Sequence, residues 1–250
     1  MLRELERRVA NETKKAAASH DFNHLLRVAK GAKWFCDILG VTEHEKQVAY
    51  AAGLLHDIIR PATEKYDPLK DAMKKAEEIM KELNMGKTET KEVLEAIHAH
   101  HYPDPKKKAG YSVFLADKLL EALGAYIVFR RAVFMGESPD FAGMGRMEAT
   151  TRHWTARINK WHPSGYEKRF AKLIDYQFSW CQKFLDAFRR GEQWSLNLND
   201  AGFEAGKKGT STDKFIASFK PGLKEEKEFK EEALSYIRGD KFSMFTEMII

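Results

Sequence analysis

Apolar residues recur three and four positions apart along most of the chain, which is the spacing of amphipathic helices. No stretch shows the strict alternation of apolar and polar residues that is typical of a half-buried strand. With Ser19 and Thr42 as helix caps and Gly40 as a stop, the pattern predicts helices over residues 2–18, 19–39, 42–57, 68–83, 88–101 and 112–135, two more between 147 and 190, and a charged amphipathic one near 223–237. We therefore expect an all-α fold.

The chain changes character near residue 190, where apolar stripes give way to a stretch containing glycine, lysine and threonine and then to a charged segment. We place a domain boundary there. This predicts a helical domain over residues 1–190 and a C-terminal extension of mixed helix and loop over residues 191–250. The extension is expected to pack on the domain or to serve an interface, for example between copies of the chain in a homo-oligomer.

Four polar residues stand inside or at the end of apolar helical stripes: His24, the pair His56 and Asp57, and Asp117. Buried carboxylates and imidazoles are costly unless something pairs with them, and a divalent cation is the obvious partner. Two imidazoles with two carboxylates form a mixed nitrogen and oxygen ligand set, suited to Mn, Fe, Co, Ni, Zn or, less well, Mg. Four protein ligands would leave positions open for water and substrate, as in a catalytic metal site.

The flanking residues extend this pattern. The segments that carry it read His20-Asp-Phe-Asn-His-Leu-Leu-Arg-Val28, Leu54-Leu-His-Asp-Ile-Ile-Arg60 and Ala116-Asp-Lys-Leu119. Over residues 18–135 the chain resembles the HD-domain metal-dependent phosphohydrolases, in particular a small stand-alone subgroup. The resemblance implies an all-helical bundle around one divalent metal held by His24, His56, Asp57 and Asp117. It also implies hydrolysis of a small phosphorylated substrate, such as a nucleotide, by a metal-bound hydroxide that Asp57 orients or deprotonates.

Basic residues beside the proposed ligands are candidates for binding the phosphate. Arg27, Arg60 and Lys118 each adjoin a proposed ligand in the sequence. Developing negative charge on a phosphoryl group needs fixed cations around it, and these three side chains could supply them. The structural alternative for each is a solvated side chain or a surface ion pair.

The helix that ends at His101 adds a second group of histidines. Its apolar spacing predicts that His98 and His101 face inward and that His100 faces outward. We expect His98 to line the pocket as a catalytic residue and His101 to contact substrate. The two could instead hold a second metal ion, as in the two-metal branches of the family that the chain resembles.

Composition narrows the remaining possibilities. The net charge of +5, from 42 basic and 37 acidic residues, suits an anionic ligand but is too small to indicate nucleic acid. The chain shows neither a long apolar run nor a leader pattern, and its two cysteines lie far apart, so we expect a cytoplasmic protein without a membrane partner. Two alternatives stay open: a non-catalytic HD module that binds a nucleotide or a protein, and a di-iron oxygenase.

Overall fold

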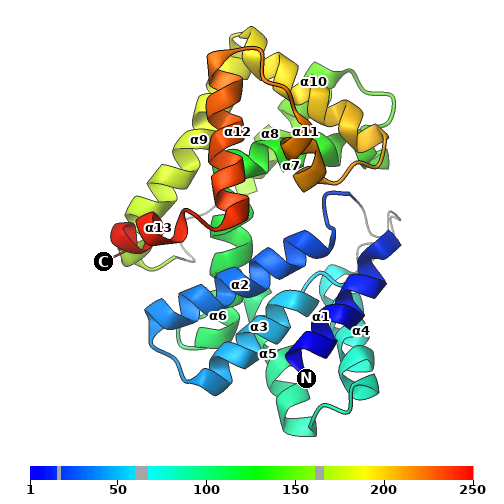
Figure 1. The fold of residues 1–250 in the computed structure, drawn as a ribbon, viewed down its shortest axis with the longest axis vertical. Coiled ribbons are helices and arrows are strands. Elements are labelled where there is room, and N and C mark those ends of the chain that lie inside the picture. The colour runs from blue at the N-terminus through cyan, green and yellow to red at the C-terminus, as the bar shows by residue number, and fades with distance from the viewer. Residues whose placement is uncertain (16–17, 60–66, 161–165, 250) are drawn as a thin grey trace. The chain divides into compact units, whose positions relative to one another are not determined.

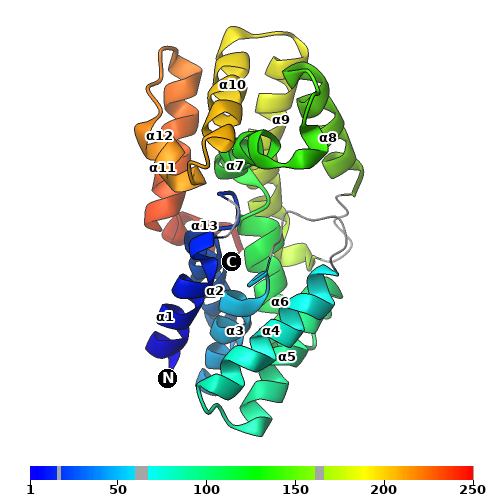
Figure 2. The same ribbon diagram turned by 90° about the vertical axis from the view of Figure 1, so that its right-hand side faces the viewer.

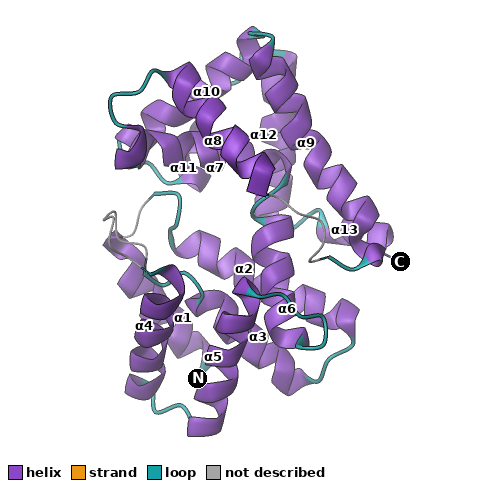
Figure 3. Ribbon diagram, turned by 180° about the vertical axis from the view of Figure 1, so that it is seen from behind, coloured by secondary structure: helices purple, strands orange, loops and turns teal. Residues whose placement is uncertain are grey.

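The computed structural model describes residues 1–15, 18–59, 67–160 and 166–249. These residues form thirteen α-helices and no strand, so the all-α prediction is confirmed. Figure 3 shows this helical architecture from behind. Within these ranges no helix has the combination of length and apolar character needed to cross a membrane. The chain divides into two compact units, Met1–Glu121 and Ala122–Ile250.

The first unit is a helical bundle that surrounds an apolar core (Figures 1 and 2). Helices α2, α3, α5 and α6 form its centre through the contacts of α2 with α3 and α6, and of α5 with α3 and α6. Helices α1 and α4 pack on the outside of this group. The bounds are α1 (Leu2–Glu12), α2 (Phe22–Leu39), α3 (Glu43–Leu55), α4 (Pro68–Glu82), α5 (Lys87–His101) and α6 (Lys108–Leu115).

The contact between α2 and α3 is unusually close. Thr42 begins α3 through the predicted capping box, in which its side chain and that of Glu45 each bind the other residue's backbone N–H. Further along α3, a Cβ atom placed on Gly53 would lie 2.6 Å from the Cα atom of Ala29 in α2. Only glycine lets the two backbones approach this closely. Gly53 therefore sets the separation of the two helices that carry His24 and His56.

The helix predicted over residues 112–135 is broken, and that prediction is wrong. Helix α6 passes into a π-helical turn, η2 (Ala116–Leu120), and the backbone is extended at Leu123. A new helix, α7 (Gly124–Glu137), then begins at Gly124, whose φ of +84° favours glycine over every other residue. The apolar pattern runs through this break because residues on both sides of it are buried.

The second unit is built around α7, which packs against α8, α9, α10, α11 and α12. The two helices predicted between 147 and 190 are confirmed, as is the amphipathic helix near 223–237. The boundary that we predicted near residue 190 falls inside this unit, because α10 packs on α7 and α9. The bounds are α8 (Arg146–Lys160), α9 (Ala171–Arg189), α10 (Gln193–Lys207), α11 (Thr212–Ser218), α12 (Lys224–Arg238) and α13 (Phe242–Ile249).

Candidate metal centre

His24 lies in the first turn of α2. Asp21, rather than the predicted Ser19, caps this helix: its Oδ1 atom accepts a hydrogen bond from the backbone N–H of His24 at 3.1 Å. The side chain of His24 points into the first unit and is buried. The cap thus fixes the start of the helix and, with it, the position of this imidazole.

His56 and Asp57 follow the last residue of α3, Leu55, as predicted. His56 keeps helical backbone angles, and the chain then turns so that the N–H of Ile58 donates to the carbonyl of Leu55 at 3.2 Å. His56 is fully buried, and Asp57 is buried beside it. The Nε2 atom of His56 lies 3.7 Å from the Oδ2 atom of Asp57.

Asp117 is carried by the π-helical turn η2. In this turn the N–H of Glu121 donates to the carbonyl of Ala116, five residues earlier, at 3.0 Å. Such turns are rare and occur mostly as single-turn bulges, frequently at functional sites. The carboxylate of Asp117 is buried in the first unit.

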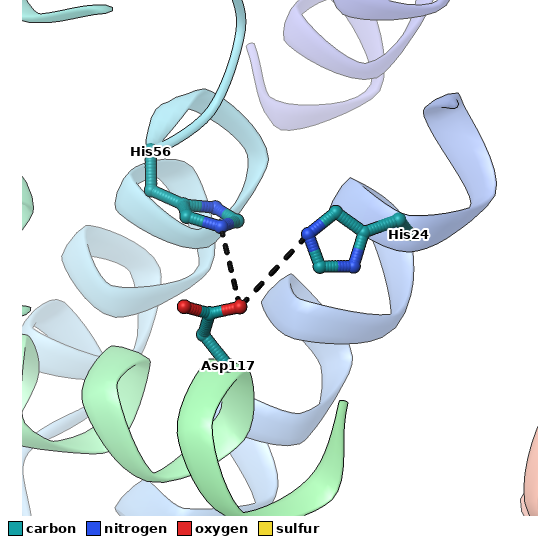
Figure 4. Close-up of side chains that lie close together, drawn as sticks. All are labelled: His24, His56 and Asp117. Carbon is teal, nitrogen blue, oxygen red and sulfur yellow. Dashed lines mark ion pairs between the residues drawn. The ribbon is translucent and has the colours of Figure 1, made fainter. Parts of the chain in front are cut away.

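The two imidazoles converge on the carboxylate of Asp117. Figure 4 shows His24, His56 and Asp117 reaching one point from three separate helical segments. The Nε2 atoms of His24 and His56 lie 3.9 and 3.8 Å from the Oδ1 atom of Asp117. The three residues offer ligand atoms that all lie within 4.8 Å of one another. Asp57 is not a member of this group and remains a predicted fourth ligand.

A third imidazole reaches Asp117, and it is not the one that we predicted. His100 is buried, with its Nε2 atom 3.4 Å from the Oδ2 atom of Asp117, whereas His98 is exposed. The predicted directions of these two histidines are therefore wrong. The buried face of α5 includes the small residues Ala96 and Ala99, which allow close packing on α6, and this turns His100 inward.

Comparison with known families agrees with this geometry. Residues 21–122 match the family model of the HD domain. The chain contains an HD domain. No curated protein and no solved structure matches the chain. HD domains are generally metal-dependent phosphohydrolases and bind divalent metals, and the matched residues include all four predicted ligands.

Each of the three imidazoles around Asp117 is held through its Nδ1 atom. His56 and His100 contact the backbone carbonyl three residues earlier in their own segments, at 2.9 and 3.1 Å. His24 instead contacts the Oε2 atom of Glu121, at 2.9 Å. Because carbonyl and carboxylate oxygens only accept, each Nδ1 atom carries the proton. Each Nε2 atom is then the basic nitrogen, and it is directed at Asp117.

The cluster of His24, His56 and Asp117, with the side chains next to it, is called the HD site below. The charges in this site favour a protonation state that can bind a metal. Burial alone would raise the pKa of Asp117, but the Lys118 ammonium, together with the nearby rings of His100 and His56, outweighs it and holds that pKa well below its usual range. Burial lowers the pKa of His56, which keeps this imidazole neutral. Burial also lowers the pKa of His101 to about 4, with the nearby His100 and Lys118 acting in the same direction. An ionised carboxylate beside a neutral imidazole is the state that a divalent cation requires.

The residues of the HD site fit a divalent metal. Among the described residues, the buried Nε2 atom of His56 has no hydrogen-bond partner. A buried nitrogen in that condition is costly unless a cation or another partner meets it. The donor set of two imidazole nitrogens and a carboxylate oxygen, with Asp57 beside them, suits the transition metals that we expected from the sequence.

The predicted phosphate contacts are placed unevenly around the HD site. Lys118 lies next to the site, with its Nζ atom 2.6 Å from the Oδ2 atom of Asp117 and its side chain 43% exposed. Arg27 is turned inward, and its Nε atom donates a hydrogen bond to the Oε1 atom of Glu121. His101 is half-buried at the end of α5, and Arg60 lies outside the described residues.

Sequence reasoning missed two buried polar residues near the ligands. Glu121 is fully buried, and its position four residues after Asp117 in an apolar stripe was a usable signal. His20 is also buried: its ring lies 5.8 Å from that of His24, and its Nδ1 atom is 2.8 Å from the Oγ atom of Ser19. Nothing in the apolar spacing indicates His20, because it precedes the first residue of α2.

Proposed function

We propose that the protein is a metal-dependent phosphatase or phosphodiesterase that cleaves an ester bond of a small phosphorylated molecule, such as a nucleotide. The observation that supports this most is the convergence of three Nε2 atoms on the ionised carboxylate of Asp117. A closed structural site would use all of its ligands on the metal. Here His100 and Lys118 add polar atoms at the same carboxylate that can meet a substrate.

In this proposal His24, His56, Asp57 and Asp117 hold one divalent ion. Such an ion, when bound, lowers the pKa of a coordinated water and polarises a phosphoryl oxygen. The metal identity is open among Mn, Fe, Co, Ni, Zn and Mg, because affinity for these ions follows a general order that the ligand set modifies only slightly.

The other side chains would handle protons and phosphate charge. Asp57 lies beside His56 and would take a proton from the attacking water. Lys118 would bind a phosphoryl oxygen, because its ammonium is partly exposed and lies at the site. His100 would take up a proton at its basic Nε2 atom and pass it to the leaving oxygen, so it replaces His98 as the candidate catalytic histidine. Arg60 and His101 remain candidate phosphate contacts.

We also propose a cytoplasmic location. Cys36 and Cys181 are both unpaired and buried, which is typical of proteins in a reducing compartment. A pool of small phosphorylated metabolites is available there.

The role of His100 can be tested against a matched neighbour. We expect His100→Gln to reduce kcat for phosphate esters by about 10²- to 10⁴-fold, the usual range for loss of a general acid or base. His98→Gln, on the same helix but at an exposed position, should leave kcat within about twofold. Phosphate release from a panel of nucleotides and other phosphomonoesters and diesters, with Mn²⁺, Co²⁺, Ni²⁺, Zn²⁺ or Mg²⁺, measures both.

Equal losses in both variants, or none in His100→Gln, would contradict the assignment of His100. Metal binding without hydrolysis of any ester in the panel would favour the non-catalytic binding module. Two iron ions per chain would favour the oxidative alternative, although the exposure of His98 weakens the case for His98 and His101 as ligands of a second ion.

A further inference from the structure

Glu121 is a buried carboxylate whose two oxygens are both engaged. Its side chain is 0% exposed. The Oε2 atom lies 2.9 Å from the Nδ1 atom of His24, and the Oε1 atom accepts a hydrogen bond from the Nε atom of Arg27 at 2.7 Å. Burying a carboxylate is strongly unfavourable unless it is paired and hydrogen-bonded, and Arg27 and His24 meet both conditions.

Arg27 and Glu121 come from the same two helical segments as the candidate ligands His24 and Asp117. On α2, Arg27 follows His24 by three residues, so both lie on one face. On η2, Glu121 follows Asp117 by four residues, across the π-helical turn. An extra residue in a helical turn rotates the residues after it by about 100° relative to a regular α-helix. The turn therefore sets the direction of Glu121 relative to that of Asp117.

His24 differs from the other two imidazoles in the kind of atom that holds its Nδ1. His56 and His100 hold Nδ1 through carbonyls of their own backbone. His24 lies in the first turn of α2, and the corresponding carbonyl, that of Asp21, already accepts the backbone N–H groups of His24 and Leu25. At His24 the acceptor is instead a side-chain oxygen, the Oε2 atom of Glu121.

We propose that Glu121 is a positioning residue for His24: it fixes the Nδ1–H tautomer and the ring orientation, so that Nε2 is presented to a divalent metal, while Arg27 neutralises the buried carboxylate. The inference rests on the metal site of the proposed function. It also gives Arg27 a role different from the substrate contact that its position in the sequence indicates. Outer partners of this kind orient metal-binding histidines and raise their basicity.

The tautomer of His24 is the first test, and it needs no variant. In the metal-free protein at pH 8, ¹⁵N–¹H correlation spectra of the histidine rings should show His24 protonated at Nδ1. Detection of the Nε2–H tautomer at His24 in the unaltered protein would overturn the proposal, because Glu121 could not then accept from Nδ1.

Metal affinity in variants is the second test. Glu121→Ala should raise the Kd for Mn²⁺ or Co²⁺ by about 10- to 100-fold, the usual loss for such a partner, and shift His24 toward the Nε2–H tautomer. Glu121→Gln keeps an amide oxygen that can accept from Nδ1, so it should restore most of the affinity and the Nδ1–H tautomer.

A matched control is Glu226→Gln. Glu226 is also buried and hydrogen-bonded, but it accepts from the backbone of Gly222 and Leu223 at the start of α12. This variant should change thermal stability without changing metal Kd or the His24 spectrum. Unchanged metal affinity in Glu121→Ala would contradict the proposal, as would an equal loss in Glu226→Gln.

The two proposals fail separately. If the unaltered protein shows the expected tautomer and affinities but hydrolyses no ester, the proposed function is contradicted and the role of Glu121 stands. If the unaltered protein hydrolyses esters while Glu121→Ala binds metal normally, only the role of Glu121 is contradicted.

Discussion

The three histidines around Asp117 present Nε2 because Nδ1 is already engaged. Two of them are held by backbone carbonyls and one by Glu121, so their tautomers follow from the hydrogen bonds and not from the metal. A site whose ligands are oriented before the ion arrives loses less conformational entropy on binding. The hydrogen bonds at Nδ1 therefore contribute to metal binding by orienting the three rings in advance.

A buried histidine in the second unit gives a pH-dependent prediction. The ring centroid of His153 lies 5.5 Å from that of Phe134 and 5.6 Å from that of Phe141. Burial, together with the guanidinium groups of Arg131 and Arg157, lowers the pKa of His153 to about 3, from an ordinary value of 6.5. The unfolded chain therefore binds this proton more tightly than the folded chain does.

The stabilisation from neutral His153 is complete above pH 6.5 and is lost as the pH falls toward 3. His153→Phe should reduce the slope of unfolding free energy against pH between 6 and 4 by up to about 1.4 kcal/mol per pH unit, the contribution of one proton. Urea unfolding followed by circular dichroism at several pH values measures it. An unchanged slope would show that His153 is protonated in the folded protein.

Among the individual residues of the site, the sequence predicted His24, His56 and Asp117 because each interrupts an apolar stripe. It failed for His100 because the inward face of α5 is marked partly by alanines, which carry little weight in a hydrophobic pattern. It did not reveal Glu121 as the partner of His24, because that contact joins residues 97 positions apart.

Helices bring these residues together, and their spacing depends on small residues at the contacts. In an exposed helix, Gly→Ala usually stabilises by about 1 kcal/mol. At Gly53 the added Cβ would lie 2.6 Å from the Cα atom of Ala29, so α2 and α3 would have to move apart. Overpacking of this kind costs about 1–3 kcal/mol.

We therefore expect Gly53→Ala to lower the free energy of unfolding and to weaken Mn²⁺ binding, because it separates His24 from His56. Gly86→Ala is the matched control: Gly86 precedes α5, and a Cβ there has no atom within 4 Å. Urea unfolding and metal titration of both variants test this. A Gly53→Ala protein as stable as the unaltered one would show that the two backbones can adjust.

The elements themselves were largely predictable. Helical spacing, the Thr42 capping box and the ends of α2 and α3 follow from local sequence. The π-helical turn and the break before Gly124 do not, since apolar residues continue through both. Only the glycine signals a change there, and a single glycine within an apolar run is also compatible with an unbroken helix.

The HD match at residues 21–122 falls almost entirely within the first compact unit, Met1–Glu121. All four predicted ligands belong to that unit. The boundary predicted near residue 190 followed a change in composition, whereas the observed division follows packing: α7 is buried among the helices of the second unit. Composition does not report such contacts, so the sequence alone could not place the division.

The proposed function requires that His24, His56, Asp57 and Asp117 hold one divalent ion. The most direct test is the metal content per chain, by elemental analysis of protein purified without chelator or a histidine tag and compared with Asp117→Ala. We predict about one equivalent in the unaltered protein and almost none in the variant, with helical content preserved. Equal metal content in both proteins, or none in the unaltered protein after incubation with Mn²⁺, Co²⁺ or Ni²⁺, would contradict this four-ligand metal site.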